Sequence, residues 1–270
     1  MTSLDIGISG CAGRMGRMLV AEASGTPGCR VVAGAEATGH PALGRDLGEL
    51  AGTGTIGVAV SDDPAVLFRL ADVVIDFSTP DTATASARAA AANKKPLLLG
   101  TTGLNTEQGE VVRAAAKIVP IVWPPNTSLG ITLLLAMVED AARRLGPEWD
   151  IEIVEMHHKH KVDAPSGTAL ALGHAAAAGR GLDLAQNSIR GRDGITGARK
   201  EATIGFAALR GGDVAGDHTV IFAGAGERLE LTHRAGTRQI FAKGAIKAAL
   251  WLGRPDRRPG LYGMKDVLGL

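Results

Sequence analysis

The sequence predicts an α/β protein with an N-terminal parallel-sheet domain, followed by a C-terminal α+β domain that contains a mostly β sheet. Two observations predict this fold class. Short apolar runs alternate with helix-like runs over about the first 125 residues, which is typical of a parallel sheet covered by helices on both faces. Beyond residue 128 the pattern changes to a long helix and then several strands.

The elements of the first half follow from apolar spacing and from the residues that end each run. Helical spacing is clear in the first helix, where Met15, Met18 and Leu19 share one face. Strands are predicted at residues 4–9, 30–35, 73–77, 96–99 and 118–122, and helices at residues 14–24, 81–93 and 106–116.

The second half is predicted as a long helix over residues 129–145, a strand over 152–156 and a helix over 168–178. Strands follow at residues 202–209, 218–223 and 228–233, with hairpin turns predicted within residues 210–220 and 224–226. A final helix over 241–252 is expected to return to the first domain. The predicted domains are therefore residues 1–127 with 240–270, and residues 128–239.

Composition excludes several functional classes. The 270 residues carry a net charge of +1 and only five Phe, three Trp and one Tyr, which gives neither the basic surface nor the stacking platforms of a nucleic-acid-binding protein. Two cysteines predict neither a disulfide framework nor a thiolate metal site. No run of 18 apolar residues and no signal-like start occur, so we expect a soluble cytoplasmic protein without a membrane partner.

A glycine cluster, Gly10 to Gly16, lies where the first strand passes into the first helix. Glycines allow a tight turn and a close approach of backbone N–H groups to a pyrophosphate, as in Rossmann-like domains. Glu36 follows the second strand, where a carboxylate can accept hydrogen bonds from an adenosine ribose. The alternative is a structural glycine turn with an unrelated surface glutamate.

Two further strand ends carry residues suited to the same cofactor. Gly100, Thr101 and Thr102 follow one strand, and the segment from Pro124 to Thr127 follows another. Ligands of open parallel sheets bind beyond the carboxyl ends of the strands. The alternatives are an ordinary turn for the first segment and an interdomain elbow for the second.

The densest chemical segment contains His157, His158, His160, Lys159 and Lys161. Imidazoles exchange protons near neutral pH, and clustered cations lower one another's proton affinity. The alternatives are a solvated basic loop and a metal site through His157 and His160.

A helix is predicted to begin directly after this basic segment, at Gly167 and Thr168, and its backbone N–H groups favour a carboxylate. Farther along, His233 closes a strand and is interpreted as a histidine with satisfied hydrogen bonds.

The segment from Glu155 to Thr168 reads E-x-H-H-x-H-K-x-D-x-P-S-G-T. Together with the glycine loop, Glu36, Gly100–Gly103 and the segment 212–220, it resembles the dihydrodipicolinate reductase (4-hydroxy-tetrahydrodipicolinate reductase) family over nearly the whole chain. The resemblance implies a dinucleotide-binding domain and a C-terminal domain that binds substrate and assembles homotetramers. It also implies reduction of a cyclic dicarboxylate by NADH or NADPH in the diaminopimelate route to lysine.

The resemblance also implies roles for single residues. His157 matches the acid/base histidine and Lys161 the proton donor, which serve a hydride addition at C4 of the substrate. His158, Gly167 and Thr168 match substrate contacts, and no metal is implied. The positions that match cofactor contacts are Gly10, Cys11, Ala12, Gly13, Arg14, Met15, Glu36, Gly100, Thr101, Thr102, Pro124, Pro125, Asn126 and Thr127.

Two positions depart from the family pattern. Ala37 replaces the Arg that many members carry after the ribose-binding acid, which predicts a preference for NADH with NADPH still usable. The segment from Pro125 to Ser128 stands where many members read alanine-asparagine-phenylalanine-serine, so Thr127 replaces the phenylalanine and an aromatic cofactor contact is missing. The rival hypotheses are another nicotinamide-dependent reductase of amino-acid metabolism and a catalytically silent NAD-binding regulator. The retained His157 and Lys161 argue against the regulator.

Overall fold

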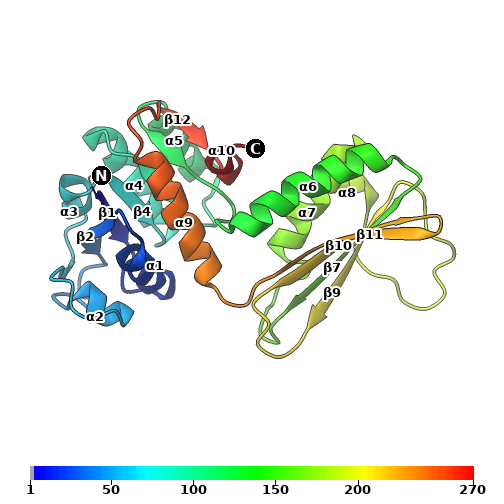
Figure 1. Ribbon diagram of the computed structural model, residues 1–270, viewed down its shortest axis with the longest axis horizontal. Helices are drawn as coiled ribbons and strands as arrows, with labels where there is room; N and C mark the ends of the chain where they lie inside the picture. Colours follow the sequence, from blue (N-terminus) through cyan, green and yellow to red (C-terminus); the bar gives the residue numbers. More distant parts are fainter. Residues whose placement is uncertain (1–2) are drawn as a thin grey trace. The chain divides into compact units, whose positions relative to one another are not determined.

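The computed structural model describes residues 3–270, and the chain divides into two compact units (Figure 1). The first comprises the chain up to Ser128 together with Gln239–Leu270, and the second comprises Leu129–Arg238. These bounds differ by one residue from the predicted ones, since Ser128 and Gln239 belong to the first unit. Gln239 starts the helix that returns to that unit, and the N–H of Ser128 is bonded to the side chain of Asn126.

The first unit contains a parallel sheet whose described strands run in the order β12-β6-β5-β4-β1-β2-β3. Their bounds are β1 (Leu4–Ser9), β2 (Cys29–Ala35), β3 (Val60–Ser61), β4 (Val73–Asp76), β5 (Leu97–Leu99), β6 (Pro120–Val122) and β12 (Gly260–Tyr262). β1 pairs with β2 on one side and β4 on the other, so the order of connection reverses there. Such a switch point leaves a crevice at the carboxyl ends of the strands.

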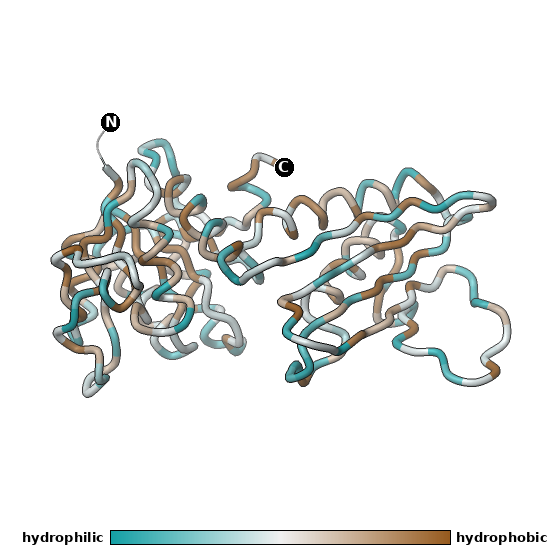
Figure 2. Tube along the Cα trace, turned by 60° about the horizontal axis from the view of Figure 1, so that its bottom comes forward, coloured by the Kyte–Doolittle hydropathy of each residue, from teal (hydrophilic) through white to brown (hydrophobic). Residues whose placement is uncertain are grey.

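Helices cover both faces of this sheet, as the alternation predicts. α3, α4 and α5 pack together on one side, and α1 packs with α9 on the other. The bounds are α1 (Arg14–Gly25), α2 (Leu47–Ala51), α3 (Ala65–Leu70), α4 (Pro80–Asn93), α5 (Thr106–Ala116), α9 (Gln239–Leu252) and α10 (Met264–Leu268). In Figure 2 hydrophobic residues run through the interior of this unit, and its outer loops are more hydrophilic.

The second unit contains a mixed sheet in the order β11-β10-β7-β9-β8 with α6 and α7 packed on it. Its elements are α6 (Leu129–Leu145), β7 (Asp150–His157), α7 (Gly167–Arg180), α8 (Leu184–Asn187), β8 (Ser188–Ile189), β9 (Ile204–Arg210), β10 (Asp217–Gly224) and β11 (Glu227–Arg234). Alternate residues of β7, Ile151 and Ile153, face the helices and join a core with Val220 and Phe222.

One connection in the second unit is not the predicted hairpin. β9 and β10 do not pair with each other, because β9 runs parallel to one side of β7 and β10 antiparallel to the other. Residues 211–216 therefore cross the carboxyl end of β7. The glycines and aspartates there were correctly interpreted as a turn, but the pairing partner, which depends on sheet order, was wrong.

Candidate active site

The loop after β1 depends on glycines for steric reasons. Gly10 has a positive φ of 74°, and a Cβ there would lie 2.6 Å from the carbonyl oxygen of Phe77. A Cβ on Gly16 would lie 2.1 Å from the carbonyl oxygen of Gly10. The first turn of α1 therefore packs directly against the loop, which only glycine at these two positions allows.

The side chains of this loop differ in exposure. The side chains of Cys11 and Ala12 are buried, whereas Gly13 and Arg14 are exposed and Met15 is half-buried. Burial, with a smaller contribution from Glu36, raises the pKa of the Cys11 thiol to about 12. Cys11 therefore stays neutral, and any contact it makes with a ligand comes from its backbone.

Glu36 lies beside this loop, as predicted. Its carboxylate accepts a hydrogen bond of 2.7 Å from the backbone N–H of Ala12. In the described chain no side chain caps the N-terminus of α1, whereas Thr79 caps α4 and Asn105 caps α5. The N-terminus of α1 thus suits an anion that completes its hydrogen bonding.

The segment after β5 is tied to β4 through a buried carboxylate. The Thr101 hydroxyl donates to Asp76 at 2.8 Å and accepts the Ser78 N–H at 2.8 Å. A Cβ on Gly100 would overlap the ring of Phe77. Gly100 and Thr101 therefore shape the turn with internal contacts, and Thr102 has the exposed side chain.

The segment after β6 holds the returning helix α9. The buried Thr127 hydroxyl donates to the carbonyl of Phe241 at 2.9 Å, and Asn126 accepts the N–H of Ser128 at 2.7 Å. Pro124 is buried and Pro125 is exposed. The Thr127 hydroxyl therefore points into this packing.

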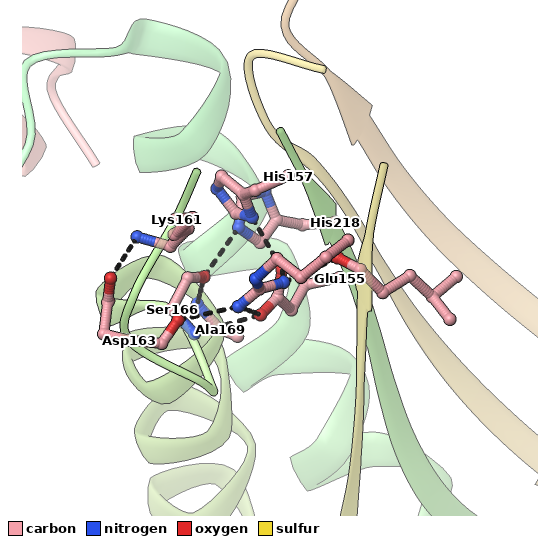
Figure 3. A network of polar contacts seen from close by, with 9 residues as sticks. Glu155, His157, Lys161, Asp163, Ser166, Ala169 and His218 are labelled. Carbon is pink, nitrogen blue, oxygen red and sulfur yellow. Dashed lines mark hydrogen bonds and ion pairs between the residues drawn. The ribbon is translucent and has the colours of Figure 1, made fainter. Parts of the chain in front are cut away.

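At the carboxyl end of β7, a buried carboxylate organises the basic segment (Figure 3). Glu155, 1% exposed, accepts two hydrogen bonds of 2.8 Å from Arg210. The same carboxylate lies 2.6 Å from Nδ1 of His157 and accepts the N–H of Ser166 at 3.2 Å. His157 is therefore anchored and is not a residue of a solvated loop.

The protonation of this group follows from its partners. Burial raises the pKa of Glu155, but the hydrogen bonds from Arg210 and His157 outweigh it and hold the pKa below its ordinary value. A carboxylate in this state only accepts hydrogen bonds. The Nδ1 atom of His157 must therefore be the donor.

A second imidazole, His218 on β10, packs edge-on against His157 with ring centroids 5.1 Å apart (Figure 3). Its Nε2 lies 3.1 Å from the Ser166 hydroxyl, and the residue is 4% exposed. Burial lowers the pKa of His218 to about 4, with a smaller contribution from neighbouring His157 when that ring is protonated. His218 is neutral near pH 7.

Lys161 lies in the loop between β7 and α7. Its Nζ donates to Asp163 at 2.7 Å, and this hydrogen bond lowers the pKa of Asp163. The lysine side chain is 19% exposed and the aspartate 56%, so the ammonium group lies near the surface beside His157 and Ser166 (Figure 3). It is placed where a ligand could replace Asp163 as its partner.

A cavity of about 660 Å³ lies next to this loop. Its lining includes His158, Lys159, His160 and Arg238, together with Gly212, Asp213 and Ala215 of the crossing segment. Burial lowers the pKa of His158, with Arg238 and His160 adding to the effect. The lining has two basic side chains that are charged near pH 7, Lys159 and Arg238, and one acid, Asp213, so the cavity favours an anion.

The N-terminus of α7 begins where predicted. Ser166 is the N-cap, and its hydroxyl accepts the N–H of Ala169 at 3.1 Å. Gly167 is exposed and Thr168 half-buried in the first turn. The first turn of a helix has N–H groups without intrahelical partners, so these two residues can bind a carboxylate.

Sequence reasoning missed Arg210 and His218 as parts of this site. Charged or polar residues at strand ends were a usable signal, but their convergence depends on sheet order. His233 is not the satisfied histidine that we expected, since its buried Nδ1 has no hydrogen-bond partner among the described residues. Within residues 3–270 no group of three or more His, Cys, Asp or Glu is arranged to hold a metal ion.

Comparison with known proteins finds a matching family for each of the two units. The N-terminal domain of dihydrodipicolinate reductase matches residues 4–127, and its C-terminal domain matches residues 130–268. The chain belongs to this family. A 4-hydroxy-tetrahydrodipicolinate reductase from Methylocella silvestris is 55% identical over 270 residues, which covers 100% of this chain and 98% of that protein. One from Halorhodospira halophila is 52% identical, with 99% and 100% coverage.

The fold agrees with a solved structure of a dihydrodipicolinate reductase from Paenisporosarcina, described as bound to dipicolinate. The TM-score is 0.79 at 24% identity, covering 98% of this chain and 99% of that one. The predicted family, fold class and enzyme class are confirmed: the chain is an oxidoreductase of a nicotinamide-dependent family. No helix in residues 3–270 is long and apolar enough to span a membrane.

Proposed function

We propose that this chain reduces 4-hydroxy-tetrahydrodipicolinate to tetrahydrodipicolinate, with NADH preferred and NADPH usable, in the diaminopimelate pathway. The observation that carries the proposal is the anchoring of His157 by buried Glu155, beside Lys161 and the N-terminus of α7. This arrangement supplies a proton-transfer group, a cation and a carboxylate site together.

The first unit would hold the dinucleotide. The glycine loop and the uncapped N-terminus of α1 fit a pyrophosphate, and Glu36 fits the adenosine ribose. The carboxylate of Glu36 repels a 2′-phosphate, and the exposed Ala37 offers no compensating cation. These two positions support the preference for NADH.

The second unit would hold the cyclic dicarboxylate. His158, Gly167 and Thr168 fit its carboxylates, and Arg238 adds a further cation in the adjoining cavity. The Paenisporosarcina relative, described as dipicolinate-bound, shows that a member of this fold accepts a planar dicarboxylate.

A bound nicotinamide supplies hydride to C4 of the conjugated imine that remains after the 4-hydroxyl leaves as water. The electron pair then moves toward C3 and the ring nitrogen, where the Lys161 ammonium stabilises the negative charge. A proton must reach C3. Lys161 is the donor. His157 serves as the acid/base group that returns a proton to Lys161.

The test is an absorbance assay of NADH oxidation by the purified protein. We expect oxidation only when the condensation product of aspartate semialdehyde and pyruvate is supplied. Oxidation with a different imine or carbonyl substrate alone would favour another reductase of amino-acid metabolism. Tight NADH binding without any turnover would favour the silent regulator.

We also propose a cytoplasmic homotetramer built through the sheet of the second unit. The face of this sheet opposite α6 and α7 carries half-buried Val154 and Ile221, and Leu209 beside them is 50% exposed. Apolar side chains on an open sheet face suit burial against another copy. Light scattering after size-exclusion chromatography tests this, and a monomer mass would contradict it.

A further inference from the structure

We propose that Glu155, clamped by Arg210, is a positioning residue that fixes the tautomer of His157. Neutral His157 then carries its proton on Nδ1. Its Nε2 is the atom that exchanges protons with groups of the loop between β7 and α7, which carries Lys161. The part of this inference that concerns catalysis rests on the proposed function, whereas the tautomer can be measured without it.

Three elements converge on the Glu155 carboxylate. β7 carries Glu155 and His157 two residues apart on the same face, β9 contributes Arg210 opposite His157, and the N-cap of α7 contributes the Ser166 N–H. The two Arg210 nitrogens reach different carboxylate oxygens at 2.8 Å. This two-point contact, with the Ser166 N–H, holds the carboxylate in one orientation.

The crossing residues 211–216 hold Arg210 in place relative to His157. The N–H of Gly211 donates to the carbonyl of His157 at 3.0 Å, and the N–H of His158 donates to the carbonyl of Val214 at 2.8 Å. The strand end that carries Arg210 is therefore fixed to the strand end that carries His157. The unexpected crossover provides this link.

The tautomer follows from the charge of Glu155. An ionised carboxylate at 2.6 Å accepts only, so Nδ1 donates and Nε2 of the neutral ring keeps the lone pair. On the Nε2 side the chain has Gly216, where a Cβ would lie 3.0 Å from that nitrogen. Glycine at this position leaves Nε2 uncovered.

Stability alone is a poor reason for this arrangement. A buried ion pair is no more stabilising than well-packed apolar residues, because desolvation offsets the attraction. A role in orienting the catalytic imidazole explains why a buried Glu155–Arg210 pair stands here in place of apolar residues. The same strand offers a comparator: Glu152 near the other end of β7 is also paired with arginines, Arg192 and Arg199, but it contacts no imidazole.

The first experiment is nitrogen-15 NMR of wild-type protein labelled at histidine, with His157 assigned from the spectrum of His157→Gln. Near neutral pH and without ligands, we expect the neutral His157 ring to carry its proton on Nδ1. Observation of the Nε2–H tautomer would overturn the inference, whatever the enzyme's substrate proves to be. Failure of NADH oxidation would instead count against the proposed function.

The second experiment compares Glu155→Gln with the matched control Glu152→Gln. We expect Glu155→Gln to lower kcat by about 10- to 50-fold, less than removal of the imidazole, with the KM for substrate and the Kd for NADH changed less than threefold. Glu152→Gln should keep kcat within twofold.

Glu155→Gln should also shift His157 to a mixture of tautomers in the NMR spectrum. Unchanged kcat, or equal losses in both variants, would overturn the inference. If Glu155→Gln does not fold, Arg210→Lys replaces it, and Arg192→Lys becomes the control. The lysine keeps the charge but gives up the two-point contact, so we expect a smaller fall in kcat.

Discussion

The two candidate sites of this chain are formed by different chemical groups, main-chain groups in the first unit and charged side chains in the second. At the carboxyl edge of the first sheet, glycines and a helix N-terminus present main-chain groups, and the side chains of Cys11, Thr101 and Thr127 are used for internal packing. At the end of β7, buried charged side chains determine the site. The first site therefore depends on backbone shape, and the second on charge and protonation.

This difference predicts how each site responds to mutation. A substitution in the glycine loop of the first site should act through the volume of a new side chain, whereas substitutions of Glu36 and Ala37 beside that loop should act through charge. One in the second site should act through a lost proton or charge, with little effect on folding where the side chain is accessible. The predictions below test this distinction, from the largest expected effect to the smallest.

His157→Gln and Lys161→Ala should each lower turnover by about two orders of magnitude, the usual contribution of general acid–base catalysis. The melting temperature of Lys161→Ala should change little, because that side chain lies near the surface. The melting temperature of His157→Gln should fall, because the buried imidazole is hydrogen-bonded to the Glu155 carboxylate. Steady-state kinetics and thermal melting are the measurements, with His174→Gln on the exposed surface of α7 as control. A variant that keeps nearly full turnover excludes that residue from the mechanism.

Gly16→Ala should weaken NADH binding by about 30-fold. Its Cβ would lie 2.1 Å from the Gly10 carbonyl oxygen, and relief of such overpacking costs roughly 2 kcal/mol. Gly25→Ala at the other end of α1 is the matched control, since nothing lies within 4 Å of its added Cβ. Titration calorimetry with NADH measures both. Equal affinities would mean that the loop shape does not govern binding.

Ala37→Arg should narrow or reverse a preference for NADH that we expect to be about tenfold. An arginine at this exposed position can form a charge-assisted hydrogen bond with the 2′-phosphate, worth about 1.5–3 kcal/mol, and NADH has no such phosphate. Ala37→Gln adds length without charge and should keep the preference. The measurement is calorimetric affinity for both nucleotides, and tighter NADPH binding by the wild type would contradict the prediction.

The sequence predicted the main elements of both sheets because each has a clear apolar period or is ended by a residue, such as glycine or proline, that breaks helices and strands. It did not predict the short β3, α2 and α3, whose few residues show no period. In the second site the motif gave His157 and Lys161, whereas Arg210 lies 55 positions from its partner Glu155. Only the order of strands around β7 brings such residues together, and local patterns do not encode it.

The smallest effect concerns His218, which makes the stability of the second unit depend on pH. Its folded pKa of about 4 lies below the ordinary value of 6.5, so the unfolded chain binds a proton that the folded chain excludes. The free energy of unfolding should therefore fall as the pH drops from about 6.5 toward 4, with this residue contributing roughly 1–2 kcal/mol between pH 7 and pH 5.

His218→Gln removes the titration and can still donate to Ser166. Its stability should therefore decline less over the same interval than that of the wild type. Denaturant unfolding at pH 7 and pH 5, at equal protein concentration, measures the difference, with exposed His174→Gln as control. Glu155, His157, His233 and Lys161 act electrostatically on this ring and are present in both proteins, so the subtraction isolates His218. If both proteins lose the same stability, the buried ring is not the group that senses pH, and a proton-dependent second site must owe that property to its other residues.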